Sequence, residues 1–265
     1  GRNMDGEVDL RKVTVSHFLL FAVDPSEPGR HRWISTMWPG FVGTLSGINE
    51  EGLYSMENAG GTGPGPVVDG LTPCTWVQRF ILENAGGEST PESIGEMIDG
   101  FRSSGGGAFG PGSIILWGVP YRNQGAPAFV SEGDRFGTAV REPGEVAPAF
   151  PFHIMATNHH RVYGVDPDRP DLYFGKQPSF SSLWRYETGK NALEARARQG
   201  TSIGTEEMRR LLQSVAHGTT EYAVIFRANE MTVDVAVDDL ATDLWDAPFR
   251  RWTTFTFEEL FQGSR

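Results

Sequence analysis

The sequence predicts an α+β fold built on antiparallel sheets. Strand-like segments occur in consecutive runs, and helical segments occur in groups between those runs. A parallel α/β sheet would instead show strict alternation of strand and helix. With 265 residues, of which 38% are hydrophobic, the chain is long enough to form a packed core. We therefore expect residues 1–265 to form one domain.

The first run of strands covers the N-terminal part of the chain. Residues 13–23 are rich in β-branched and aromatic side chains, which favours a buried strand. Three further strand-like segments follow after short turns, and "GINEEG" supplies the last turn. These segments are residues 32–38, 41–48 and 52–58. Together they predict an antiparallel meander.

Two helices are expected next, because Thr-Pro is a typical helix start. Thr72 would be the N-cap and Pro73 the first helical residue of a helix ending at Gly86, and Thr90 and Pro91 begin the second in the same way. Strands are then expected at 113–119, 126–131, 135–141 and 151–158, helices over 181–215 with Thr205 as a cap, and a hairpin over 219–237 turning at Asn229.

The composition argues against several classes of function. The formal net charge of −11 opposes binding to a phosphate backbone, so we expect no nucleic-acid partner. No apolar run approaches the roughly 20 residues that span a bilayer, so no membrane span is expected. Cys74 is the only cysteine, which excludes an intrachain disulfide and a cysteine-based metal site.

The opening run "GRNMD" combines a cation and an anion, Arg2 and Asp5. Residues three apart on a strand point to opposite faces, so the two side chains can serve one site only if the chain bends between them. The alternative is a solvated ion pair, which contributes less than about 1 kcal/mol. The run by itself favours the solvated pair.

Two later fragments end strands in polar residues. In "SMENAGG", Asn58 is either a turn residue or an amide donor for an oxyanion. In "ATNHH", Asn158 precedes His159 and a second histidine, but no metal-ligand spacing accompanies them, so no metal is expected. Cys74 follows a helix start, yet no histidine lies near it in sequence, and we expect a small buried apolar side chain.

Taken in order, "GRNMD", "GINEEGL" with "EN", "TPCTWVQRFILE" and "ATNHH" resemble the isopenicillin N acyltransferase-like family of N-terminal nucleophile (Ntn) hydrolases. Choloylglycine hydrolases, penicillin V acylases and acid ceramidases are more distant relatives of that family. The resemblance implies a four-layer αββα sandwich without metal or organic cofactor. It also implies an amidohydrolase or acyltransferase whose cysteine becomes N-terminal by autocatalytic cleavage. This cysteine attacks an amide or thioester carbonyl and uses its own α-amino group as base, and the acyl group is then hydrolysed off or transferred.

The resemblance also implies roles for individual residues. In relatives the cysteine lies upstream of the "GRNxD" run, so we expect it upstream of Gly1. Arg2 would stand beside the thiolate and favour its ionised form, and Asp5 would orient the α-amino group. Asn58 and Asn158 would serve the oxyanion hole and the amino terminus. Glu57 competes with Asn58, because the ceramidase branch has an acidic residue in that region.

The remaining expectations concern substrate and partners. Glu57, Gly60, Gly61 and His159 are expected to contact a small-molecule acyl amide. Arg227 is a weak counterpart of the late arginine of choloylglycine hydrolases, so bile-salt specificity is not expected. Retention of a cleaved N-terminal segment and a homo-oligomer are both compatible with the resemblance. Two alternatives stay open: an inactive domain that binds an acylated small molecule, and recruitment of Cys74 as nucleophile.

Overall fold

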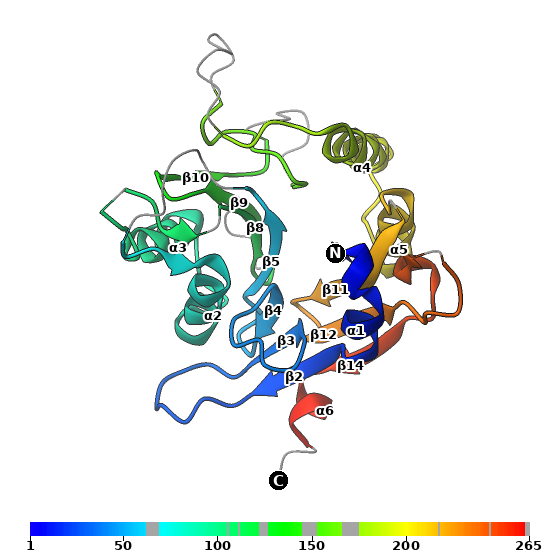
Figure 1. Ribbon diagram of the computed structural model, residues 1–265, viewed down its shortest axis with the longest axis horizontal. Coiled ribbons are helices and arrows are strands. Elements are labelled where there is room, and N and C mark those ends of the chain that lie inside the picture. Colours follow the sequence, from blue (N-terminus) through cyan, green and yellow to red (C-terminus); the bar gives the residue numbers. More distant parts are fainter. Residues whose placement is uncertain are drawn as a thin grey trace.

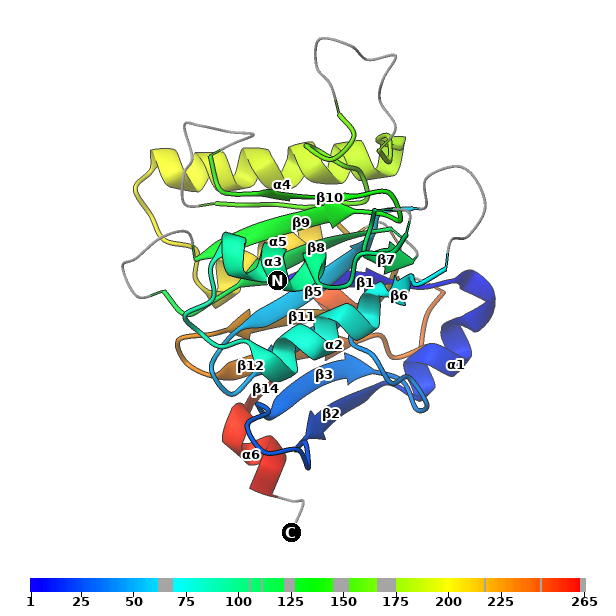
Figure 2. The same cartoon turned by 90° about the vertical axis from the view of Figure 1, so that its left-hand side faces the viewer.

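The computed structural model stacks two sheets face to face between outer helices, as an α+β sandwich (Figures 1 and 2). It describes residues 1–61, 69–104, 106–110, 112–121, 127–144, 153–165, 175–216, 218–243 and 245–262. Within these ranges the predicted fold class of stacked antiparallel sheets is confirmed.

The larger sheet, called here the large sheet, contains the predicted meander. Its strands in the described chain are β2 (Leu19–Val23), β3 (Trp33–Met37), β4 (Ser46–Asn49), β5 (Tyr54–Ala59), β8 (Ser113–Gly118), β9 (Ala128–Gly133) and β10 (Thr138–Arg141). They run antiparallel in the order β10-β9-β8-β5-β4-β3-β2. Sequential strands are neighbours from β2 to β5, as expected from the short turns between them.

The second sheet, called here the small sheet, joins the two ends of the chain. Its strands are β1 (Arg2–Asp5), β11 (Thr219–Arg227), β12 (Thr232–Val237), β14 (Thr253–Thr256) and the short β13 (Trp245–Asp246), which runs parallel to the start of β11. The predicted hairpin supplies β11 and β12. The opening run "GRNMD" is therefore a strand that pairs with β11.

The core between the sheets follows from alternation along β11. Tyr222, Val224 and Phe226 belong to the cluster between the sheets, whereas Ala223 and Ile225 pack against α5. The large sheet contributes Ile34, Ile48 and Met56 to the cluster between the sheets. Because β11 is buried on both faces, its apolar run is nearly continuous.

Helices cover the outer faces of both sheets (Figure 1). The helices α2 (Cys74–Asn84) and α3 (Pro91–Asp99) pack on the large sheet through a separate apolar cluster. On the other side, α5 (Thr205–Ser214) packs on the small sheet and against α4 (Phe180–Arg198). The remaining elements are α1 (Arg11–Ser16), α6 (Phe257–Gln262), the 3-10 turns η1 (Val8–Leu10) and η3 (Ala247–Phe249), and the short parallel pair β6 (Thr72–Pro73) and β7 (Phe109–Gly110).

Two strand predictions are wrong. Residues 13–23 are not one buried strand: α1 ends at Ser16, and only 19–23 form β2, a partly exposed edge strand. This stretch leads from the small sheet to the large sheet, so it cannot remain extended in either, and tertiary context overrides its β-propensity. Of the strand expected over 151–158, residues 151–152 lie outside the described chain, and residues 153–158 form no strand.

The helix-start predictions succeed only in part. Thr90 is an N-cap as predicted, and it exchanges hydrogen bonds with Ser93 in a capping box. Thr72 is not a cap, because it pairs with Phe109 in β6 and α2 begins at Cys74. Thr205 is the first residue of α5 and not its cap.

Candidate active site

A polar cavity lies where the end of β5 in the large sheet faces β1 in the small sheet. We call it the site cavity, and its volume is about 290 Å³. Its lining residues are Arg2, Asn3, Met4, Asp5, Leu45, Glu57, Asn58, Ala59 and Asn158. The structure thus brings together the four residues for which catalytic roles were predicted, although they come from three separate parts of the chain.

A β-bulge allows Arg2 and Asp5 to face the same cavity. Arg2 pairs with Val224, but the register shifts after Met4, so that Asp5 pairs with Thr220. Val224 and Thr220 are four residues apart on β11 and therefore share a face, and paired residues point to the same side of a sheet. The bulge supplies the bend that lets Arg2 and Asp5, which are three residues apart on the strand, point to the same side.

Arg2 is a fixed, buried cation in the wall of the site cavity. Its side chain is buried, and its Nη1 donates to the Leu45 carbonyl at 2.9 Å and to Ser46 Oγ at 2.6 Å. Burial raises the pKa of Glu57, while the charge of Arg2 and a hydrogen bond from Cys74 act in the opposite direction. Arg2 is therefore placed to stabilise a negative charge near the end of β5.

The two asparagines meet at the end of β5. Asn58 lies on that strand, and Asn158 reaches it from the segment after β10. Asn158 Oδ1 accepts from Arg185 at 2.8 Å, and its Nδ2 donates to the Ala59 carbonyl at 3.4 Å. An amide nitrogen carries two hydrogens, so one N–H of Asn158 remains for another acceptor.

Arg185 is a site residue that sequence reasoning did not identify. It lies on α4, 27 residues after Asn158. Burial lowers the pKa of Arg185, and the negative charge of Asp5 acts in the opposite direction. Arg185 is thus close enough to Asp5 for a favourable electrostatic interaction while it holds Asn158. No local motif marks it, because its proximity arises only from tertiary packing.

Arg227, the weak candidate for a late arginine, lies elsewhere. Its Nε donates to Asp234 at 3.1 Å, and it also pairs with Glu230 in the hairpin. It lines neither the site cavity nor the pocket beside it. Arg185 is the arginine that the structure places beside the predicted residues.

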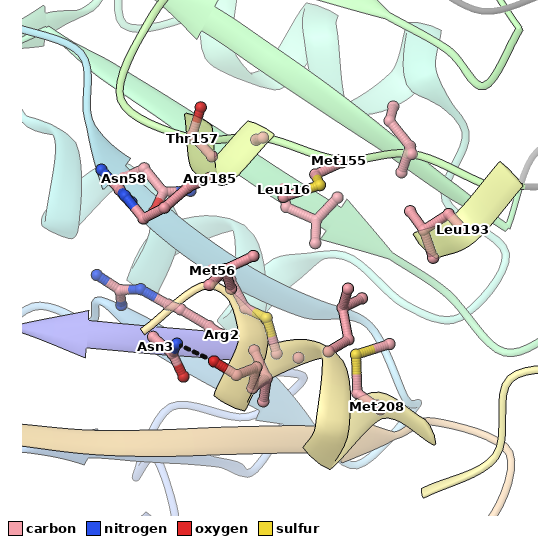
Figure 3. A pocket seen from close by; sticks show the side chains of 16 residues that line it. Arg2, Asn3, Met56, Asn58, Leu116, Met155, Thr157, Arg185, Leu193 and Met208 are labelled. Carbon is pink, nitrogen blue, oxygen red and sulfur yellow. Dashed lines mark hydrogen bonds between the residues drawn. The ribbon is translucent and has the colours of Figure 1, made fainter. Parts of the chain in front are cut away.

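A second pocket, called here the side pocket, adjoins the site cavity (Figure 3). Arg2, Asn3 and Asn58 line both. Most other lining residues are apolar: Met56, Leu116, Ile154, Met155, Ala156, Leu193, Met208, Leu211, Leu212 and Val215. In Figure 3, Arg2 and Asn3 lie on one wall, and Asn58, Thr157 and Arg185 on the other.

Not all predicted substrate contacts reach these cavities. Glu57 lines the site cavity, but His159 lines neither cavity. His159 is buried against α4, where Nδ1 lies 2.8 Å from Ser182 Oγ, and burial lowers its pKa to about 4. Gly60 donates to the Gly112 carbonyl and Gly61 has a φ of +71°; both follow Ala59 without lining the cavity.

Cys74 is the first residue of α2, and its side chain lies in the apolar cluster between α2 and the large sheet. It is 3% exposed, and its Sγ donates to Glu57 Oε1 at 3.3 Å. Burial raises the pKa of its thiol well above the usual range, and the nearby Glu57 adds to this effect. A thiol held neutral and out of solvent is a poor nucleophile.

Cys74→Ser should therefore leave amide turnover unchanged within about twofold, because the serine hydroxyl can keep the hydrogen bond to Glu57. The free energy of unfolding should fall by about 1 kcal/mol. Steady-state kinetics and thermal unfolding of the variant test this expectation. A large loss of kcat with an unchanged Tm would instead identify Cys74 as the nucleophile.

The described ranges contain neither a metal-ligand cluster nor a helix that could span a bilayer. No group of three or more His, Cys, Asp or Glu side chains there has a metal-binding arrangement. None of the helices placed in those ranges has both the length and the apolarity needed to cross a bilayer.

Comparison with solved structures relates the fold to known hydrolases. The chain superposes on a Caenorhabditis elegans N-acylethanolamine-hydrolyzing acid amidase ortholog with a TM-score of 0.55 and 16% identity, covering 96% of this chain and 92% of that one. Two structures of the conjugated bile acid hydrolase from Clostridium perfringens, an arginine-to-leucine variant and a cysteine-to-alanine mutant, each give a TM-score of 0.52. Their identities are 11% and 10%, with coverage of 86% and 91% of this chain and 78% and 84% of theirs.

No protein-family model and no curated protein sequence matches the chain. At these identities, the structural likeness concerns the fold. The chain has two stacked antiparallel sheets between outer helices, and this is the fold that it shares with these solved structures.

Proposed function

We propose that this chain forms part of an amidohydrolase, which cleaves a small-molecule acyl amide through a cysteine nucleophile. The observation that carries the proposal is the convergence of Arg2, Asp5, Asn58 and Asn158 on one cavity between the sheets. The fold of the similar structures supports it, since those proteins are an acid amidase that hydrolyses N-acylethanolamines and a conjugated bile acid hydrolase. In this proposal the cysteine lies N-terminal to Gly1 and is exposed by autocatalytic cleavage.

The free edge of β1 supports this placement of the nucleophile. Within the described ranges β1 pairs only with β11, and the two cavities together run along residues 1–5. A preceding strand that turned back along this edge would pair antiparallel with β1. Its far end would then approach Asp5, which brings a residue upstream of Gly1 to the site cavity.

The groups around the cavity suit acyl transfer to a thiol. The α-amino group of the cysteine takes the thiol proton, and the thiolate attacks the amide carbonyl carbon. Asn58 and Asn158 donate to the oxyanion of the tetrahedral intermediate. The amine then leaves with a proton from the ammonium, and water cleaves the acyl thioester to a carboxylic acid.

The charged residues have complementary tasks in this scheme. Arg2 favours the thiolate, and Asp5 orients the α-amino group and stabilises the ammonium formed from it. Arg185 holds Asn158 through its amide oxygen, which directs the amide nitrogen toward the end of β5. The hydrogen bond of Arg185 to Asn158, together with its electrostatic interaction with Asp5, would connect the oxyanion donor to the base.

Turnover of a panel of N-acyl aminomethylcoumarins by the full-length protein tests the proposal. We expect release of the fluorescent amine, and loss of that release when the upstream cysteine is replaced by alanine. Added hydroxylamine tests for the acyl thioester, because it attacks the thioester carbonyl in place of water and yields the hydroxamate, whereas hydrolysis yields the free carboxylic acid. Binding of acyl amides without any turnover would contradict the enzyme and support an inactive binding domain.

A further inference from the structure

The segment that carries Asn158 has no regular secondary structure. Residues 153–165 contain neither a helix nor a strand, so the backbone has no helical or sheet ladder to fix it. Even so, an oxyanion donor must be held within a fraction of an ångström. The position of Asn158 must therefore come from contacts with other elements.

A buried carboxylate holds the part of the segment after Asn158. Glu132 on β9 is fully buried, and its Oε2 accepts from three consecutive backbone N–H groups. These belong to Arg161, Val162 and Tyr163, at 2.8, 2.9 and 3.2 Å. One carboxylate oxygen thus satisfies three amides that no strand partner satisfies.

The same ion pair also holds the part before Asn158. Glu132 Oε1 accepts from Arg141 Nε at 2.7 Å, and Arg141 Nη2 donates to the Met155 carbonyl at 2.6 Å. Arg141 is itself buried on β10. Although burial favours the protonated form of Glu132, Arg141 and the backbone amides lower its pKa overall, so the pair is ionic.

We propose that Glu132 and Arg141 are positioning residues that place Asn158 in the site cavity. The pair fixes the backbone three residues before Asn158 and again from three residues after it, while Thr157 and His159 attach the middle to Ser182 on α4. This inference rests on the proposed function, because it gives Asn158 a task in catalysis. It assigns a role to two residues that touch no atom of the substrate.

Glu132→Gln removes the negative charge of the Glu132–Arg141 ion pair with little change in the shape of the side chain. An amide has one acceptor oxygen, so it cannot serve Arg141 and the three backbone N–H groups together. We expect kcat to fall by about 100-fold, with KM changed by less than about threefold, since a displacement near 1 Å can cost that much. Glu132→Asp, which keeps the charge, should recover part of kcat.

Asp234→Asn is the matched control for the loss of a buried carboxylate. Asp234 is 1% exposed on β12 and accepts from Arg209, Arg227 and Thr254. Neither Asp234 nor these partners line the site cavity. The control should lower the Tm as Glu132→Gln does, while kcat stays within about twofold of the parent.

A double-mutant cycle with Asn158→Ala tests the inference on the coumarin substrate that full-length protein cleaves fastest. If Glu132 acts through Asn158, Glu132→Gln should lower kcat less than about threefold in the Asn158→Ala background. Fully additive losses would overturn the positioning role. An Asn158→Ala variant with parent kcat would overturn the catalytic role proposed for Asn158, and the positioning role with it, whereas absence of any turnover by the parent protein would overturn the proposed function.

Hydrogen exchange gives a readout that does not depend on turnover. Glu132→Gln should raise the exchange rate of the amides of residues 161–163 about tenfold or more, whereas Asp234→Asn should not. Equal exchange in the two variants would show that Glu132 supports the fold generally and does not hold this segment.

Discussion

Replacing Asp5 by asparagine is expected to lower kcat and kcat/KM together, by about 100-fold or more. The change keeps the shape of the side chain and removes its charge. In the proposed scheme, the carboxylate holds the α-amino base and stabilises the ammonium that forms as the thiol attacks. Because that ammonium exists only after proton transfer, the loss falls on the transition state and not on substrate binding.

The same change should affect the fold little. Asp5 Oδ1 accepts from Thr220 Oγ1 at 2.7 Å, and an asparagine carbonyl can accept the same bond. Intact mass spectrometry must accompany the kinetics, since cleavage at the proposed cysteine would use the same site. Asp24→Asn, at an exposed carboxylate, is the control and should behave as the parent. If the Asp5→Asn variant matures normally and keeps the parent kcat, Asp5 has no catalytic role.

Replacing Asn158 by alanine should lower kcat by about 100- to 1,000-fold, the cost of removing one oxyanion donor. The variant also loses the bond from Arg185, so a partly buried guanidinium is left without that acceptor. We therefore expect a lower Tm as well. Initial rates on the coumarin panel, measured well below the variant's Tm, separate the two effects.

Asn229→Ala is the control for removal of a hydrogen-bonded asparagine. Asn229 lies in the hairpin turn and exchanges two bonds with the backbone of Tyr121, and neither residue lines the site cavity. It should lose stability without losing kcat. If Asn158→Ala loses no more kcat than Asn229→Ala, Asn158 is only a tether between its segment and Ala59.

Features predicted correctly from the sequence are those with local signals. The N-cap at Thr90 and the turn at Asn229 each depend on residues a few positions apart. The meander follows in the same way from short turns between apolar runs. The strand prediction for residues 13–23 was wrong because the conformation of this stretch depends on how the chain passes from one sheet to the other. Residue propensities carry no information about that passage.

The residues of the candidate site differ in the same way: those within a local sequence motif could be predicted, and those placed by tertiary packing could not. Arg2, Asp5 and Asn158 lie in short runs that resemble a family pattern, so they could be named before the structure was known. Glu132 binds the backbone N–H of Arg161, 29 residues away, and Arg185 binds Asn158, 27 residues away; nothing near Glu132 or Arg185 in sequence indicates these contacts. His159 shows the opposite error: it stands next to Asn158 in the motif, yet its ring turns to α4.

Trapping the acyl-enzyme tests the central claim most directly. Full-length protein is incubated with the best acyl coumarin, quenched in acid within one turnover, digested and sequenced by tandem mass spectrometry. The account predicts an acyl thioester on a cysteine N-terminal to Gly1 that carries a free α-amino group, and its absence in the variant lacking that cysteine. Turnover with the acyl group on Cys74, or with no acylated cysteine at all, would contradict the account.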